Sequence, residues 1–328
     1  MQISRRQSLT TVLSVAGVAA AGCLPTVAKA SNGHVPTGYE LVWSDEFNQL
    51  DLGNQANKWL PYWGAWNVRH LADNEDKGVK YADYETLPGG GGAGEMLQQA
   101  GQWGTGPFLH EVSGGTLKLR CFPVPATMRS RVGFPYIGSM ISGERLPAQR
   151  QGYWETRLRL TRIGRGLHFA VWLLNNKAEW PPEIDIVEMV GQHPERFSAN
   201  THVKNATPPP ITFYNAPNGA AGWHVFGFEW TDQYMRWTVD GIKVREHGAL
   251  FTNDELYILF SWEIGSKWPG LPDGTTPWPG EAEIDYVRLY RRAPSSPIQN
   301  GQVIPTMPTI TTRSIFLRAP RKMRWISG

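Results

Sequence analysis

Three carboxylates fall within six residues of this chain, at Glu183, Asp185 and Glu188. The residues between them are Ile and Val, which are β-branched and favour a strand. In a regular strand Glu183 and Asp185 share a face and Glu188 points the other way, because side chains alternate with a period of two. One extra residue, a β-bulge, would bring Glu188 onto the same face.

Such a bulged strand would suit the cleavage of glycosidic bonds. At ~3.3 Å per residue the outer two Cα atoms lie about 13 Å apart, and two Glu side chains can lean inward from that spacing. A retaining glycosidase needs two carboxyl groups about 5–5.5 Å apart, one as nucleophile and one as acid/base. Asp185 between them can tune both by sharing a proton or a hydrogen bond.

A second interpretation of the same residues stays open. Alternating acidic residues and Ile are also typical of an ordinary half-exposed strand. Residues 283–288 repeat the Glu-Ile-Asp pattern, but Arg288 stands where the second glutamate would be. The pattern Glu-Ile-Asp is therefore not specific by itself, and only residues 183–188 carry the full set of carboxylates.

Size and aromatic content are compatible with a sugar-binding β protein. The 328 residues are enough for one large β domain or two ordinary domains. The chain has 15 Trp, and aromatic residues make up 12% of it. Two explanations are open: a surface that stacks on sugar rings, or a large sandwich core that uses Trp.

The N-terminus has the features of an export signal. Residues 4–9 (Ser-Arg-Arg-Gln-Ser-Leu) contain a twin arginine, an apolar run covers residues 9–21, and Ala-Lys-Ala at 28–30 is an expected cleavage site. The run is short for a membrane span. We expect residues 1–30 to direct a bacterial protein to the periplasm or the medium. Acylation at Cys23 is the lipoprotein alternative.

Charge and cysteine content after cleavage argue against nucleic-acid binding and against an intramolecular disulfide. Removal of residues 1–30 takes away Arg5, Arg6 and Lys29, which brings the 32 basic residues level with the 29 acidic ones. A formally neutral chain disfavours non-specific nucleic-acid binding. Cys121 would be the only cysteine left, so no intramolecular disulfide could form. We expect it to be a buried apolar residue.

Strand patterns dominate the middle of the chain and predict an antiparallel sandwich. Asp240-Gly241 between two alternating runs predicts a hairpin. Residues 137–144 and 153–160 are expected to pair, and a helical turn is expected at 252–255. The strands are predicted at residues 39–43, 116–120, 137–144, 153–160, 167–174, 183–188, 198–203, 223–231, 235–239, 242–245, 256–263 and 281–291.

Two segments are not explained by this pattern. Residues 59–111 are long, irregular and aromatic, which is typical of functional loops, although the glycine run at 89–92 is also compatible with disorder. Residues 293–328 are rich in Pro, Ser, Thr and Arg and contain no acid, which predicts a basic disordered tail. The expected divisions are an export signal at 1–30, one domain at 31–292 and the tail at 293–328.

Taken together, these motifs resemble glycoside hydrolase family 16, which includes laminarinases and lichenases. The form with six residues from the first to the last carboxylate matches the bulged version of that family's catalytic motif. Pro182 departs from it, because many laminarinases have Gly there. The matching segments are residues 41–47, 152–157, 169–174, 180–188, 226–231, 237–241 and 283–290.

The resemblance implies an all-β, concanavalin A-like jelly roll of two antiparallel sheets with a concave glycan-binding cleft. It also implies a retaining endo-β-glucanase in which Glu183 is the nucleophile, Asp185 assists and Glu188 is the acid/base. Trp172 and Trp180 would line the subsites beside the cleaved bond. His202 occupies a position where relatives often place a cleft histidine, and a structural histidine is the other interpretation.

The expected substrate is a β-1,3- or mixed β-1,3/1,4-glucan. Alternatives are a bacterial exopolysaccharide, transglycosylation, or a non-catalytic glycan-binding protein on the same fold. We expect a monomer that requires no cofactor. The eight His are scattered without metal-ligand spacing, so no catalytic metal is predicted. A structural Ca²⁺ on the convex face is common among relatives, but no ligands for it can be named.

Overall fold

The computed structural model describes residues 34–53, 56–61, 70–71, 79–81, 109–124, 126, 129–132, 135–177, 179–265 and 268–294. Strands make up most of this part of the chain. They are β1 (Tyr39–Asp45), β2 (His70–Leu71), β3 (Val79–Tyr81), β4 (His110–Ser113), β5 (Thr116–Pro123), β6 (Tyr136–Gly138), β7 (Met140–Ser142), β8 (Gly152–Arg162), β9 (Leu167–Asn175), β10 (Glu183–Val190), β11 (Arg196–His202), β12 (Thr212–Asn215), β13 (His224–Trp230), β14 (Tyr234–Val239), β15 (Ile242–Gly248), β16 (Leu256–Ile264) and β17 (Gly280–Arg292). The helices are α2 (Arg129–Val132) and the 3₁₀ turn η2 (Gly219–Ala221).

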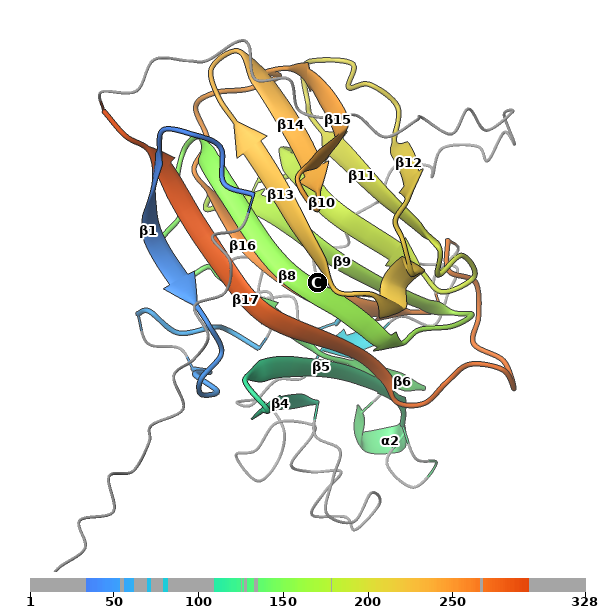
Figure 1. Ribbon diagram of the computed structural model, residues 1–328. Coiled ribbons are helices and arrows are strands. Elements are labelled where there is room, and N and C mark those ends of the chain that lie inside the picture. The colour runs from blue at the N-terminus through green and yellow to red at the C-terminus, as the bar shows by residue number, and fades with distance from the viewer. Residues whose placement is uncertain are drawn as a thin grey trace, which may run out of the picture. The chain divides into compact units, whose positions relative to one another are not determined.

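The strands form two sheets packed face to face. One has eleven strands in the order β15-β14-β13-β8-β17-β5-β6-β3-β2, with β1 beside β17 and β4 beside β5. The other has six, in the order β12-β11-β10-β9-β16-β7. In Figure 1 the layer with β13, β8 and β17 lies in front of the layer with β11, β10 and β9. The predicted jelly-roll sandwich is confirmed, with one parallel pair, β3 and β6, among otherwise antiparallel strands.

The core between the sheets is rich in tryptophan. Trp154, Trp230, Trp237 and Trp262 are among the largest fully buried side chains. The indole of Trp237 on β14 donates a 2.9 Å hydrogen bond to the carbonyl oxygen of Asp185 on β10. The indole of Trp262 on β16 donates one of 3.0 Å to the carbonyl oxygen of Leu119 on β5. Much of the tryptophan content therefore serves the core, and two of these rings fasten one sheet to the other.

Several local predictions are confirmed. Every residue of β9 is buried, as expected for a continuous apolar run. The hairpin between β14 and β15 turns at Asp240 and Gly241, whose φ angles are 50° and 77°. Positive φ at both central residues is what a type I′ turn requires. Cys121 is a free and fully buried thiol.

Two local predictions are wrong. Residues 137–144 do not pair with 153–160: β7 pairs with β16 in one sheet, and β8 pairs with β13 and β17 in the other. The chain passes from one sheet to the other between β7 and β8. The alternation of polar and apolar residues is the same whether two successive strands pair as a hairpin or lie in different sheets. Residues 252–255 form no helical turn. The carbonyl oxygen of Glu255 instead accepts a 3.3 Å hydrogen bond from the backbone N–H of Asn176, which holds the segment against the end of β9.

Some predictions fall outside the described residues. They are the export signal at 1–30, acylation of Cys23, most of the segment 59–111 and nearly all of the tail 293–328, and these stay predictions. Within the described ranges, no helix is both long and apolar enough to span a bilayer.

Candidate active site

A β-bulge in β10 brings the three carboxylates onto one face. Against β9, Asp185 pairs with Trp172 and Val187 pairs with the next residue, Val171, so β10 has one residue more than its partner. The register against β11 shifts in the same interval. The extra residue reverses the alternation before Glu188, as the sequence predicted. Glu183, Asp185 and Glu188 therefore share one face at the middle of the six-stranded sheet.

Strand pairing brings two of the predicted binding residues onto the same face. Residues directly opposite each other in an antiparallel pair have neighbouring side chains. Trp172 on β9 lies opposite Asp185, and His202 on β11 lies opposite Glu183. Trp172 is buried, and its indole N–H donates a 3.1 Å hydrogen bond to Oγ of Ser261. Trp180, just before β10, is 37% exposed.

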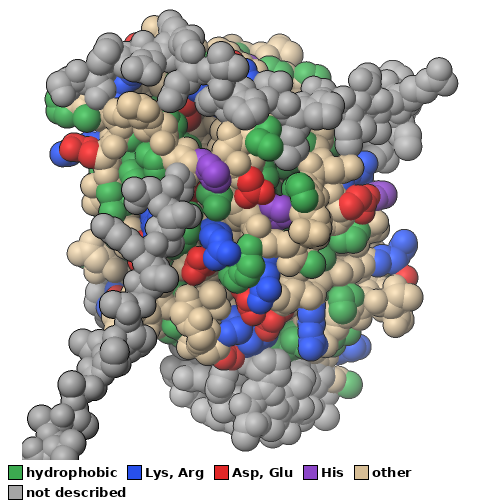
Figure 2. Space-filling model, viewed as in Figure 1, with side chains coloured by type: hydrophobic (Ala, Val, Ile, Leu, Met, Phe, Trp, Pro, Cys, Tyr) green, Lys and Arg blue, Asp and Glu red, His purple; other side chains and the backbone are tan. Residues whose placement is uncertain are grey.

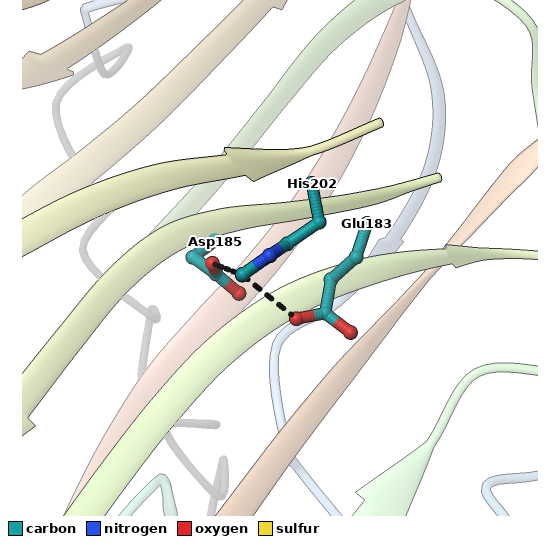
Figure 3. Close-up of side chains that lie close together, drawn as sticks. All are labelled: Glu183, Asp185 and His202. Atoms are coloured by element: carbon teal, nitrogen blue, oxygen red, sulfur yellow. Dashed lines mark ion pairs between the residues drawn. The ribbon is translucent and has the colours of Figure 1, made fainter. Parts of the chain in front are cut away.

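His202 lies between two of the carboxylates (Figure 3). Its Nε2 is 3.5 Å from Oε1 of Glu183 and 3.3 Å from Oδ2 of Asp185. Burial alone would lower the pKa of His202, but Asp185 and then Glu183 raise it to about 9. His202 is therefore an imidazolium at neutral pH. It compensates the two negative charges, which no Lys or Arg among the described residues contacts as an ion pair.

Glu183 has a strongly perturbed acidity. Burial, and next the charge of Asp185, raise the pKa of Glu183 well above its ordinary value. The charge of His202 and a 3.0 Å hydrogen bond from the indole N–H of Trp180 act in the opposite direction. These two partners favour the ionised form, which is the form that can act as a nucleophile.

Glu188 is poised to exchange a proton near neutral pH. Burial and the charge of Asp185 raise its pKa, the neighbouring His168 lowers it, and the resulting pKa is about 7. Nε2 of His168 is 3.4 Å from Oε1 of Glu188. Among the described residues, Oε2 of Glu188 has no hydrogen-bond partner. One oxygen of the carboxyl group therefore lies beside the imidazole of His168, and the other is buried without a hydrogen-bond partner among the described residues.

Two residues of this face were not predicted from the sequence. His168 and Glu263 lie on β9 and β16, and Nδ1 of His168 is 3.4 Å from Oε2 of Glu263. His168 precedes Trp172 by four residues, so strand alternation could have placed it on the same face. Its pairing with Glu263, 95 residues away, requires knowledge of which strands are neighbours.

The second Glu-Ile-Asp segment provides an internal comparison. Glu283 and Asp285 lie on β17 in the other sheet, where Glu283 pairs with Arg159 at 2.7 Å and Asp285 with Arg157 at 2.6 Å. Figure 2 shows basic and acidic side chains next to one another on this face of the molecule. Each carboxylate there has its own arginine, which is typical of a solvated strand face. The carboxylates of β10 are instead crowded together.

The same cluster has the spacing of a metal site. One ligand atom from each of Glu183, Asp185 and His202 lies within 4.8 Å of the other two. The ion pairs of His202 with both carboxylates already account for this arrangement through charge compensation, so we assign no metal to it.

Comparisons with known proteins agree with this geometry. A family model described as glycosyl hydrolases family 16 matches residues 116–288, more than half of the chain. Endo-1,3-1,4-beta-glycanase ExsH of Rhizobium meliloti (strain 1021) is 28% identical over 257 residues, which cover 76% of this chain and 51% of that protein. The chain thus spans about half the length of ExsH. A beta-glucanase of Rhodothermus marinus is 28% identical over 285 residues, covering 77% of this chain and 85% of that protein.

A solved structure shows the same fold. The catalytic domain of an endo-1,3-beta-glucanase (laminarinase) from Thermotoga petrophila RKU-1 has a TM-score of 0.60 at 22% identity, over 77% of this chain and 98% of that one. The matched segment, residues 116–288, contains the whole of β10 with its bulge and its three carboxylates. The chain therefore belongs to glycosyl hydrolases family 16.

Proposed function

We propose that this protein is a retaining endo-glycosidase that cleaves β-1,3- or mixed β-1,3/1,4-glucan. The observation that carries the proposal is the shared face of Glu183 and Glu188 with Asp185 between them. Two carboxyl groups in different environments are what double displacement requires, because one must be ionised while the other holds a proton.

In the first step, Glu188 donates its proton to the glycosidic oxygen while Glu183 attacks the anomeric carbon from the opposite face. The bond to the leaving sugar breaks, and a glycosyl ester forms on Glu183. The pKa of about 7 for Glu188 keeps much of it protonated at neutral pH. The imidazolium of His202 and the indole N–H of Trp180 favour the anionic Glu183.

In the second step, the now ionised Glu188 removes a proton from water, which attacks the same anomeric carbon and releases Glu183. Two inversions give net retention of configuration. The assisting role proposed for Asp185 is supported by its position: it is buried, it pairs with His202, and its charge raises the pKa of both glutamates. None of these steps needs a cofactor.

The glucan substrate is supported by the named relatives and by the aromatic residues of the site. ExsH is named an endo-1,3-1,4-beta-glycanase, and the Rhodothermus marinus relative a beta-glucanase. The exposed ring of Trp180 adjoins Glu183 and can stack on the apolar face of a sugar. Trp172, with its N–H held by Ser261, would contribute ring surface beneath the cleaved bond.

The decisive experiment measures reducing-sugar release from laminarin and mixed-linkage β-glucan. We expect Glu183→Gln to abolish release and Glu283→Gln, the equivalent change in the Arg-paired segment of β17, to keep it. An aryl β-glucoside oligomer with a good leaving group needs no acid, so Glu188→Gln should still form the glycosyl-enzyme from it. NMR of the first product should show retained anomeric configuration.

The outcomes separate the alternatives. Wild-type protein that binds glucan without cleaving it would overturn the hydrolase proposal in favour of a glycan-binding protein. Products longer than the substrate would indicate transglycosylation. Equal loss of activity in Glu183→Gln and Glu283→Gln would show a general effect on folding and would contradict the assigned nucleophile.

We also propose that the protein is exported as a monomer through the twin-arginine signal and cleaved after Ala30. Replacing Arg5 and Arg6 by Lys should retain the precursor in the cytoplasm, as cell fractionation would show. A structural Ca²⁺ stays a prediction from the family resemblance. A fall in the unfolding temperature on adding a chelator, reversed by Ca²⁺, would support it.

A further inference from the structure

His168 is a buried charged residue that the double-displacement steps leave without a role. It lies on β9 and is 5% exposed. Its two ring nitrogens face two carboxylates: Nε2 is 3.4 Å from Oε1 of Glu188, and Nδ1 is 3.4 Å from Oε2 of Glu263. The indole of Trp268 lies 5.0 Å from the imidazole, measured between ring centroids. The imidazole is thus held between a catalytic carboxyl group and a second acid on the neighbouring strand.

We propose that His168, held by Glu263, is a positioning residue that fixes the orientation of Glu188 and stabilises its ionised form. This inference rests on the proposed role of Glu188 as the acid/base. The contact of Nε2 with Glu188 is an ion pair rather than a hydrogen bond, because Nε2 has no hydrogen-bond partner among the described residues, whereas Nδ1 is within hydrogen-bond distance of Glu263. The charge of an imidazolium therefore acts on both carboxylates.

The charge of His168 lies next to one oxygen of Glu188. Oε1 is 3.4 Å from Nε2 of His168, while Oε2 is buried and has no hydrogen-bond partner among the described residues. His168 keeps both its protons throughout, and the negative charge that develops on Glu188 as the bond breaks lies beside a positive charge already in place.

Glu263 has a separate task, which is to keep His168 charged. Burial alone would lower the pKa of His168, and the two carboxylates raise it to about 10. Glu263 contacts Nδ1 of His168, on the side of the ring opposite Glu188, so its effect on Glu188 passes through His168. The other ionisable groups that act on Glu188 are Glu183 and Asp185 from its own strand, His202 from β11 and Tyr214 from β12.

A structural histidine elsewhere in the fold provides a matched control. His224 on β13 is 4% exposed, and its Nδ1 pairs with Oδ2 of Asp240 at 2.7 Å. It resembles His168 in burial and in having a carboxylate partner, but it lies in the other sheet. A histidine that only stabilises the fold should change stability without moving the pH dependence of catalysis.

The test compares pH profiles of kcat/KM on soluble β-glucan for wild type, His168→Gln and His224→Gln. Loss of the imidazolium should raise the pKa of Glu188, because an opposite charge at this range favours the ionised form by about 1–3 pK units. The acid must be protonated to react, so the basic limb should move to higher pH in His168→Gln. We expect kcat to fall about tenfold or more with KM nearly unchanged. The basic limb should stay in place in His224→Gln.

NMR titration makes the test independent of activity. The carboxyl ¹³C resonance of Glu188, assigned by its loss in Glu188→Gln, should titrate at higher pH in His168→Gln than in wild type. The ring resonances of His168 should titrate at lower pH in Glu263→Gln, a variant that also serves if His168→Gln does not fold. Unmoved titrations in both variants would overturn the positioning role. A wild-type protein that cleaves no glucan would overturn the proposed function instead. The titrations would still show whether His168 interacts with Glu188 and Glu263.

Discussion

The indole Nε1 of Trp180 donates a 3.0 Å hydrogen bond to Oε2 of Glu183, three residues further along the chain. The same ring lies 5.7 Å from the imidazole of His202, measured between centroids. Trp180 therefore has two separable features at the site, an N–H that favours the ionised form of Glu183 and an exposed ring face that a sugar can stack on.

Replacing Trp180 by Phe keeps a ring and removes the N–H. A hydrogen bond to a charged group contributes about 1.5–3 kcal/mol, so kcat/KM should fall about 10- to 150-fold. The N–H lowers the pKa of Glu183, and its loss should raise that pKa further. Because the nucleophile must be ionised, activity should begin to fall at a higher pH on acidification. A pH series of kcat/KM measures both effects.

The matched control is Trp223→Phe. Trp223 is half-buried and stacks under the guanidinium groups of Arg157 and Arg159, 4.4 and 4.7 Å from its ring centroid, in the other sheet. This variant should keep the wild-type pH profile. An acid limb that is identical in Trp180→Phe and Trp223→Phe would contradict the role of the Trp180 N–H.

The wild-type enzyme should lose activity as the pH rises above about 7, the pKa of Glu188. The sign follows from the role proposed for Glu188: the first step needs the protonated acid, and deprotonation removes it. Above this pKa, kcat/KM should fall about tenfold per pH unit. An aryl glycoside with a good leaving group should show a flatter basic limb, because its departure needs no acid. Full activity on glucan up to pH 9 would contradict the assignment of Glu188.

The bulged strand with the three carboxylates could be predicted because its information is local. Three carboxylates in six residues and one bulge suffice to place Glu183, Asp185 and Glu188 on one face, and both registers confirm the bulge. The same local reasoning identified the Asp240-Gly241 turn. The comparison segment at 283–285 was also distinguishable, since Arg288 replaces the last carboxylate there.

What could not be predicted depends on contacts between distant segments. His168 meets Glu263 only because β16 pairs with β9. Local alternation cannot show that pairing, and it also failed to show that β7 and β8 lie in different sheets. The tryptophans raised the same difficulty. Trp237 and Trp262 fasten the two sheets together, whereas Trp180 is exposed at the site, and composition alone could not separate these uses.

A buried carboxylate outside the site should control stability. Glu155 is 1% exposed and accepts hydrogen bonds from the hydroxyls of Tyr286 at 3.0 Å and Tyr153 at 3.2 Å, and from the backbone N–H of His34 at 2.9 Å. Tyr286→Phe should lower the free energy of unfolding by about 1.5–3 kcal/mol, the contribution of a hydrogen bond to a charged group. Urea denaturation would measure it.

Tyr214→Phe is the control for that experiment. Tyr214 is also buried, but its hydroxyl has no hydrogen-bond partner among the described residues. Removing that hydroxyl should leave stability nearly unchanged or increase it, because an unpaired buried polar group is costly. Equal losses in the two variants would show that Glu155 contributes nothing specific through Tyr286.

The end of β10 depends on a close approach of two glycines. A Cβ on Gly191 would lie 1.7 Å from the carbonyl oxygen of Gly164, a distance that no side chain can occupy. The backbone N–H of Gly191 also donates a 2.8 Å hydrogen bond to the carbonyl oxygen of Leu167 at the start of β9. Gly191→Ala must therefore move backbone, and should cost about 3 kcal/mol or more, the upper end for overpacking. Gly274→Ala, whose Cβ would meet nothing within 4 Å, should be neutral by the same denaturation assay.

Because Gly191 directly follows the strand that carries Glu188, the Gly191 variant should also lose activity at temperatures where it is still folded. Full activity in a destabilised Gly191→Ala protein would show that the site does not depend on this contact.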